Sequence, residues 1–450
     1  MLLDGSDISD TQTVNMSSLG LAFSASFAGD RPMTSGRRSY ARIKSFRCTR
    51  LSCKASSSES GYEQSVPIPA DRLRPVIQLP VPNRRCLTHK VVVMGATSPV
   101  AQQLVLLLKL FRSIRVLNLY EETKEGASGM LESIASDLSG ICTAPTVKAF
   151  SDDDDLQDCF WDADIVVIAA GSEEGADTTK DFENKGLAIR RYIDLIYRYS
   201  TQALIMIMTK PIESMVPMAA EYMVLRGQYG TCRLFGLTGY HSIQANALVA
   251  SMKNLHGKGF FQHLRPPFFG MASLTDYFGD LSVTWPPRTN WACVDVPVVG
   301  GDVGDTIVPL LSKVYPAGSV EGIQFTEEEA LLLRAQLQGE NRQSVYAVAY
   351  AAARFIDTCL RALSGYIPES FERKAMMPLY DYAFVAVNPL GDSSEYFTCK
   401  IELGVAGIQH IYLSDLTTQS QEEMVAIAAA KEALKAPIQR GKDFAISHPM

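Results

Sequence analysis

Short apolar runs alternate with segments of helical periodicity between about residues 89 and 235. An unbroken run of about four to eight apolar residues predicts a buried strand, and apolar positions three or four apart predict an amphipathic helix. One such strand, KVVVMGA (Lys90–Ala96), ends in glycine and leads into the helical stretch VAQQLVLLLKLF. Further runs are IRVLNLYEE, ADIVVIAAG and QALIMIMTKP, the last two separated by a helix around Gly186–Tyr199. Strands that alternate with helices predict an α/β fold with a doubly wound parallel sheet.

The pattern changes after about residue 235. Long helical stretches and hairpin-like segments follow, such as RQSVYAVAYAAARFIDTCLRALSG and EYFTCKIELGVAGIQHIYLSD, and a last amphipathic helix is expected over about Gln421–Ile438. This mixture predicts a second domain of the α+β class. We therefore expect one domain over residues 89–235 and another over residues 236–445.

Composition and charge restrict the functions of this chain. It has 450 residues, of which 47% are hydrophobic, and a formal net charge of −7. A nucleic-acid-binding protein needs a basic face to release counterions, so we expect no nucleic-acid partner. No apolar run reaches about 18 residues, so we expect no transmembrane segment. The nine cysteines show neither a CxxC pair nor a spacing typical of zinc ligands, so we expect no metal.

The first 55 residues differ from the rest. Arg31–Lys54 is rich in Arg, Lys, Ser and Thr and has no acidic residue, which is typical of an organelle transit peptide. We expect residues 1–55 to direct the chain to the plastid (chloroplast stroma) in preference to the mitochondrion. A start at Met16 would remove three early acids that do not fit this pattern. The alternative is a disordered Ser-rich tail. Residues 56–88 are expected to form a linker.

Several sequence segments occur together in one known family. They are RLFGLTGYHSIQANALVASMKNL, CVDVPVVGG, PLLSKVYP, FTEEE, AYAAARFIDTCLRAL and IQHIYLSDL. With these segments in this order, His89–Lys442 resembles the NAD-dependent malate dehydrogenases of the lactate/malate dehydrogenase superfamily, most closely the plastid type. The resemblance implies a Rossmann doubly wound parallel sheet followed by an α+β lactate/malate dehydrogenase C-terminal domain. It also implies NAD as cofactor and a dimer formed through helices.

The resemblance places the dinucleotide-binding loop at GATSPVA. Family members have three glycines here, which let the backbone turn tightly and approach the pyrophosphate. This chain keeps Gly95 but has Ser98 and Ala101 at the other two positions, and Pro99 removes a backbone N–H. Glu121 occupies the position of the family's ribose-binding acid, although an acid after a strand is commonly only a solvated cap. We expect NAD binding to be weak or absent.

The family's proton-transfer residues are exchanged in this chain. The family uses a histidine, which has a pKa suited to taking the hydroxyl proton, and an aspartate that orients it. Here the aspartate position is His241 and the histidine position is Asp302. A carboxylate is a poor base for an alcohol unless burial raises its pKa by several units. We expect a buried hydrogen-bonded pair; the less favoured alternative is a working pair in reversed order.

The substrate-binding positions have changed as well. The family holds a dicarboxylate with three arginines, because guanidinium groups bind carboxylates through paired hydrogen bonds. The matching positions are Glu174, Lys180 and Gln244, so most of the positive charge is lost. Lys210 stands where the family has an asparagine, and we expect it to pair with Asp302 or Glu174.

One segment has no counterpart in the family. It spans about residues 258–292 and contains two of the three tryptophans, several phenylalanines and two Pro-Pro pairs. Aromatic residues at this density, when exposed, are typical of a contact surface for a protein partner. The alternative is an intron translated in error.

Three functions are compatible with these substitutions. We favour a catalytically inactive plastid pseudoenzyme with a structural, assembly or regulatory role, either as a homodimer or as a heterodimer with a related dehydrogenase. The second is an enzyme of altered specificity that uses Asp302, His241 and Lys180. The third is a sensor that binds NAD through Gly95 and Glu121 without turnover. The fold-level resemblance alone implies an active malate dehydrogenase.

Overall fold

Parallel strands form the centre of the first half of the fold. The computed structural model describes residues 66–67, 88–122, 129–151, 156–170, 179–227, 231–253, 294–316, 322–339, 345–364, 379–387, 395–416 and 420–449. The parallel strands are β2 (His89–Met94), β3 (Ile114–Tyr120), β4 (Thr146–Phe150), β5 (Ile165–Ile168), β6 (Leu204–Ile207) and β7 (Leu234–Gly236). They lie side by side in the order β4-β3-β2-β5-β6-β7. Counted along the chain, this is the 3-2-1-4-5-6 order of the Rossmann fold, so the predicted doubly wound sheet is confirmed.

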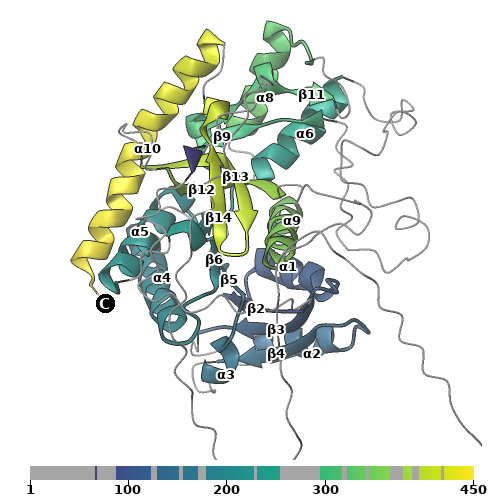
Figure 1. Cartoon of the computed structure of the whole chain (residues 1–450), viewed down its shortest axis with the longest axis vertical. Helices are drawn as coiled ribbons and strands as arrows, with labels where there is room; N and C mark the ends of the chain where they lie inside the picture. The colour runs from purple at the N-terminus through teal and green to yellow at the C-terminus, as the bar shows by residue number, and fades with distance from the viewer. Residues whose placement is uncertain are drawn as a thin grey trace, which may run out of the picture. The chain divides into compact units, whose positions relative to one another are not determined.

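Helices cover both faces of this sheet, which explains why the central strands are continuously apolar. α1 (Pro99–Lys109) packs with α9 (Val345–Leu363) on one side. α4 (Thr179–Tyr199), α5 (Ile212–Leu225) and α10 (Gln421–Ser447) pack together on the other side (Figure 1). The short helices α2 (Met130–Ser139) and α3 (Leu156–Phe160) connect strands of the parallel half.

The second half is antiparallel and continues the same sheet. β12 (Leu379–Ala386), β13 (Tyr396–Gly404) and β14 (Gly407–Tyr412) pair in sequence, and β12 joins the parallel half where Phe384 faces Gly236 of β7. Two shorter antiparallel pairs follow α6 (Tyr240–Met252). They are β9 (Val298–Gly300) with β10 (Ile307–Pro309), and β8 (Val294–Asp295) with β11 (Tyr315–Pro316). With α8 (Glu327–Gln338), these elements form the expected α+β part.

Two helices are longer than the sequence pattern predicts. α4 begins at Thr179, before the expected start near Gly186, and α10 continues beyond the expected end near Ile438 to Ser447. Contact with α5 stabilises α10 beyond its proline, and the Pro437 carbonyl accepts a hydrogen bond of 2.8 Å from the Ser214 hydroxyl of α5.

Little of the N-terminal region is described. Within the expected linker, β1 (Val66–Pro67) pairs antiparallel with β14, Val66 lying opposite Ile411. The expected transit peptide, residues 1–55, lies outside the described residues, as does the insertion at residues 258–292.

Candidate functional site

Three chain segments bring Lys210, His241 and Asp302 together. Lys210 follows β6, His241 lies in the first turn of α6 after β7, and Asp302 follows the glycine pair at the end of β9. The carboxyl ends of parallel strands are where this fold class places its ligands. His241 Nε2 lies 3.0 Å from Asp302 Oδ1, and Lys210 Nζ lies 3.2 Å from Asp302 Oδ2. The two oxygens of one carboxylate therefore face two different nitrogen groups.

This cluster is buried. Asp302 and His241 are each 1% exposed, and Lys210 is 7% exposed. Burial by itself would raise the pKa of Asp302, but the Lys210 ammonium and the hydrogen bond with His241 outweigh it and hold the pKa below its ordinary value. An ionised carboxylate only accepts hydrogen bonds, so His241 Nε2 is the donor in this contact. Among the described residues, His241 Nδ1 has no hydrogen-bond partner.

A fourth buried group was not predicted as part of the site. Glu213 lies in the first turn of α5, is 4% exposed, and accepts a 2.7 Å hydrogen bond from the backbone N–H of Asp302. Burial, together with the nearby Asp302 charge, raises the pKa of Glu213 to about 7. An acid in the first turn of a mostly apolar helix, three residues after Lys210, was the sequence signal for this group.

Aromatic contacts complete the surroundings of Lys210. Its ammonium lies 5.5 Å from the centre of the Tyr240 ring, and the rings of Tyr240 and His241 are 3.9 Å apart. A cation over an aromatic face is attracted to the ring electrons. The Lys210 side-chain nitrogen therefore lies between the Asp302 carboxylate on one side and the Tyr240 ring on the other.

The predicted substrate positions do not join this cluster. Lys180 is exposed in the first turn of α4, and Gln244 is half-buried in α6. Neither makes a hydrogen bond or ion pair with the buried cluster within the described part of the chain. Glu174 lies outside the described residues.

One position in the loop after β2 requires glycine. Gly95 has φ +74°, and a Cβ there would lie 2.4 Å from the backbone nitrogen of Ala170. Ser98 is the N-cap of α1; its Oγ accepts from the Ala101 N–H at 3.3 Å and lies 3.2 Å from the Ala169 carbonyl. Ala101 itself is fully buried in the core. The loop therefore retains its tight turn, and the Ser98 side chain caps the N-terminus of α1.

Glu121 is bonded to this loop. Its Oε2 accepts hydrogen bonds from the Thr97 N–H at 3.1 Å and from the Thr97 hydroxyl at 2.8 Å. A pyrophosphate at a helix N-terminus is bound by backbone N–H groups of this kind. Here the N–H groups of Thr97 and Ala101 are engaged and Pro99 has none. Two backbone N–H groups of this loop are therefore already engaged within the protein.

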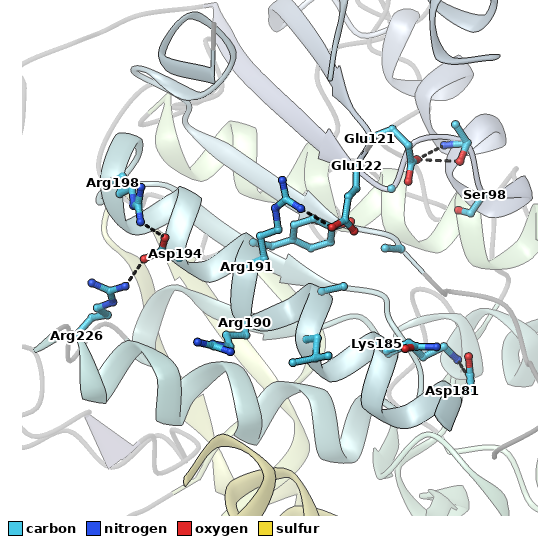
Figure 2. Close-up of a pocket in the computed structure, with 17 residues that line it drawn as sticks. Ser98, Glu121, Glu122, Asp181, Lys185, Arg190, Arg191, Asp194, Arg198 and Arg226 are labelled. Atoms are coloured by element: carbon cyan, nitrogen blue, oxygen red, sulfur yellow. Dashed lines mark hydrogen bonds and ion pairs between the residues drawn. The ribbon is translucent and has the colours of Figure 1, made fainter. Parts of the chain in front are cut away.

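A cavity of about 1000 Å³ extends from this loop along α4 (Figure 2). Volumes of this size accommodate organic ligands. Gly95, Ser98 and Glu121 line one end. The α4 wall is rich in charged residues, namely Asp181, Lys185, Arg190, Arg191, Asp194 and Arg198, together with Arg226 after α5.

The described part of the chain shows neither a membrane-spanning helix nor a metal site. No helix there is long and apolar enough to cross a membrane, and no group of three or more His, Cys, Asp or Glu residues is arranged to hold a metal ion. The described cysteines, Cys142, Cys159, Cys232, Cys359 and Cys399, are free thiols.

Comparison with known proteins agrees with the fold. The lactate/malate dehydrogenase NAD binding domain matches residues 89–236, and the lactate/malate dehydrogenase alpha/beta C-terminal domain matches residues 289–445. The chain is 31% identical over 370 residues to the chloroplastic malate dehydrogenase of Arabidopsis thaliana, covering 80% of this chain and 78% of the relative. It is 32% identical over 372 residues to the malate dehydrogenase of Pseudoalteromonas translucida (strain TAC 125), covering 79% and 99%.

A solved structure shows the same fold at lower identity. The malate dehydrogenase of Cryptosporidium parvum aligns with a TM-score of 0.56 and 16% identity, covering 79% of this chain and 99% of that one. The two domain matches together span more than half of the chain, in the order that the two halves of the sheet follow. The chain therefore belongs to the lactate/malate dehydrogenase family.

Proposed function

We propose that this protein is a malate dehydrogenase-like pseudoenzyme that does not interconvert malate and oxaloacetate. The observation that carries the proposal is the buried pairing of Asp302 with both Lys210 and His241. Hydride transfer from a hydroxyl requires a group that takes the hydroxyl proton, and such a base works best with a pKa near the working pH. Asp302 is held ionised with a low pKa, so it takes up a proton poorly.

The surroundings of His241 support the same proposal. Its Nε2 is directed to Asp302, and only 1% of the residue is exposed. A substrate hydroxyl therefore has no access to an imidazole nitrogen in this arrangement, because proton transfer needs direct hydrogen-bond contact or one bridging water. The reversed dyad is thus the weaker alternative.

Cofactor binding is proposed to be weak or absent. NAD, when bound, supplies the hydride acceptor in this family, and Gly95 and Glu121 are the residues here that would hold it. The bonds between Thr97 and Glu121 compete with that role. A nucleotide sensor without turnover remains a second candidate, and the cavity beside Gly95 favours it.

The proposed role is structural, assembly or regulatory within the plastid. The similarity to a chloroplastic relative and the transit-like residues 1–55 support this location. We propose that the chain forms a homodimer, or a heterodimer with an active relative, and that the aromatic segment at residues 258–292 contacts a partner protein.

Two measurements on the full chain test the proposal. Calorimetry would measure NADH binding, and loss of NADH absorbance would measure turnover with oxaloacetate and with other 2-oxo acids. We expect no turnover with any of them. Saturable NADH binding without turnover would favour the sensor. Turnover with oxaloacetate would contradict the proposal, and turnover only with another 2-oxo acid would support an enzyme of altered specificity.

A further inference from the structure

One strand near the edge of the sheet lacks the charged residues that commonly protect such edges. In the strand order, β14 would be the outermost strand on its side if β1 were absent. Its sequence, GIQHIY, contains no Lys, Arg, Asp or Glu, whereas β4 at the opposite edge carries the exposed Lys148. An uncharged edge offers its unpaired backbone N–H and C=O groups to another strand.

β14 is also a firmly held strand. Its other side pairs with β13, and Ile408 and Ile411 are 4% and 3% exposed within the hydrophobic core. A strand that is fixed in this way presents its outer backbone groups in a regular row. Such a row is a template for the addition of a further strand, either from the same chain or from another.

β1, the purple strand in Figure 1, covers part of this row by backbone pairing. Val66 lies opposite Ile411, and Pro67 lies opposite His410. Opposed residues in antiparallel strands alternate between pairs that exchange two backbone hydrogen bonds and pairs that exchange none. Because Pro67 has no backbone N–H, it cannot exchange two bonds with His410. The bonded pair is therefore Val66 with Ile411.

The same alternation determines what the outer side of β1 offers. Val66 directs its N–H and C=O groups to β14, so the backbone of Pro67 is directed the other way, out of the sheet. The outward position therefore has no N–H to donate. Proline at such a position is one of the means by which edge strands avoid further pairing. β1 thus pairs on one side and resists pairing on the other.

We propose that β1 closes the β14 edge against a second copy of this chain. Without β1, the outer backbone groups of β14 are open, and two identical edges can pair antiparallel about a twofold axis. A second copy fits this edge because the pairing is self-complementary and no charge on either β14 opposes it. This inference goes beyond the proposed pseudoenzyme role and does not depend on it.

The test compares two variants of the full chain at Val66. Val66→Pro removes the N–H that bonds to the Ile411 carbonyl. Val66→Thr is the matched control, because threonine keeps both the N–H and a branched side chain. Hydrogen exchange followed by mass spectrometry measures the protection of the β14 amides. Light scattering after size-exclusion chromatography measures the molecular mass at several protein concentrations.

We expect the Ile411 amide to exchange about tenfold faster in Val66→Pro than in the wild type, because the reciprocal pair of bonds is lost. The same variant should form a species of twice the wild-type mass, whose share rises with concentration, while Val66→Thr behaves as the wild type.

Three results would overturn the proposal. Unchanged exchange in Val66→Pro would show that β1 does not cover β14. Faster exchange at an unchanged mass would show that β1 does not exclude a second copy. Equal effects in Val66→Pro and Val66→Thr would assign them to the side chain and not to the backbone pairing.

Discussion

Lys210 determines whether a carboxylate can remain ionised inside this protein. Asp302 is 1% exposed, and desolvation of an unpaired carboxylate costs several kcal/mol. The ammonium at 3.2 Å and the imidazole at 3.0 Å offset much of that penalty. Lys210 and Asp302 are therefore physically coupled, since each charged residue stabilises the other.

Replacing Lys210 by methionine removes the charge but keeps the apolar stem. We expect the free energy of unfolding to fall by about 3–5 kcal/mol, because a buried carboxylate loses its cationic partner. Urea denaturation measures this. Lys148→Met is the control: Lys148 is exposed and pairs with exposed Asp158, so a change of less than about 1 kcal/mol is expected. A loss for Lys210→Met no larger than in the control would show that Lys210 does not stabilise Asp302.

Glu213 makes the free energy of unfolding depend on pH. Its pKa is about 7 in the folded protein and ordinarily 4.5, so between these two pH values the folded protein binds more protons than the unfolded chain. This group therefore makes stability fall as pH rises, by up to about 1.4 kcal/mol per pH unit. The Glu213→Gln variant lacks this titration. We therefore expect its stability, relative to that of the wild type, to increase between pH 5 and pH 8. A difference independent of pH in urea titrations would rule out this protonation of Glu213.

At the scale of helices and strands, the parallel half was largely predictable. Continuous apolar runs such as Val91–Met94 identify strands that are covered on both faces, and alternation with helices determines the sheet type. The ends of α4 and α10 were not predictable. Pro437 normally marks the end of a helix, and only the contact with α5 explains why α10 continues.

α10 and α5 approach so closely that one position requires glycine. A Cβ on Gly441 of α10 would lie 2.1 Å from the backbone oxygen of Ser214 in α5. We expect Gly441→Ala to destabilise the protein by about 1–3 kcal/mol, despite the higher helix propensity of alanine, because the helices must separate. Gln439→Ala, at an exposed position of the same helix, should change stability by less than about 0.5 kcal/mol. Thermal unfolding of both variants measures the difference, and equal midpoints would contradict the packing described.

At the scale of the whole molecule, the sequence predicted contacts among His241, Asp302 and Lys210 but not the other bonds around them. Resemblance to the family placed His241, Asp302 and Lys210 in one region, although they are far apart along the chain. The bonds from Thr97 to Glu121 and from Asp302 to Glu213 could not be predicted. They depend on the relative placement of loops that follow different strands, which no local pattern specifies.

We propose that the Lys210–Asp302–His241 cluster does not carry a proton for dehydrogenation. The most direct test is the rate of NADH oxidation with oxaloacetate, measured for the wild type and for His241→Asn purified in the same way. We expect both rates to equal that of the protein-free blank. A wild-type rate above the blank that disappears in His241→Asn would contradict it, because the exchanged residues would then be working as a catalytic pair.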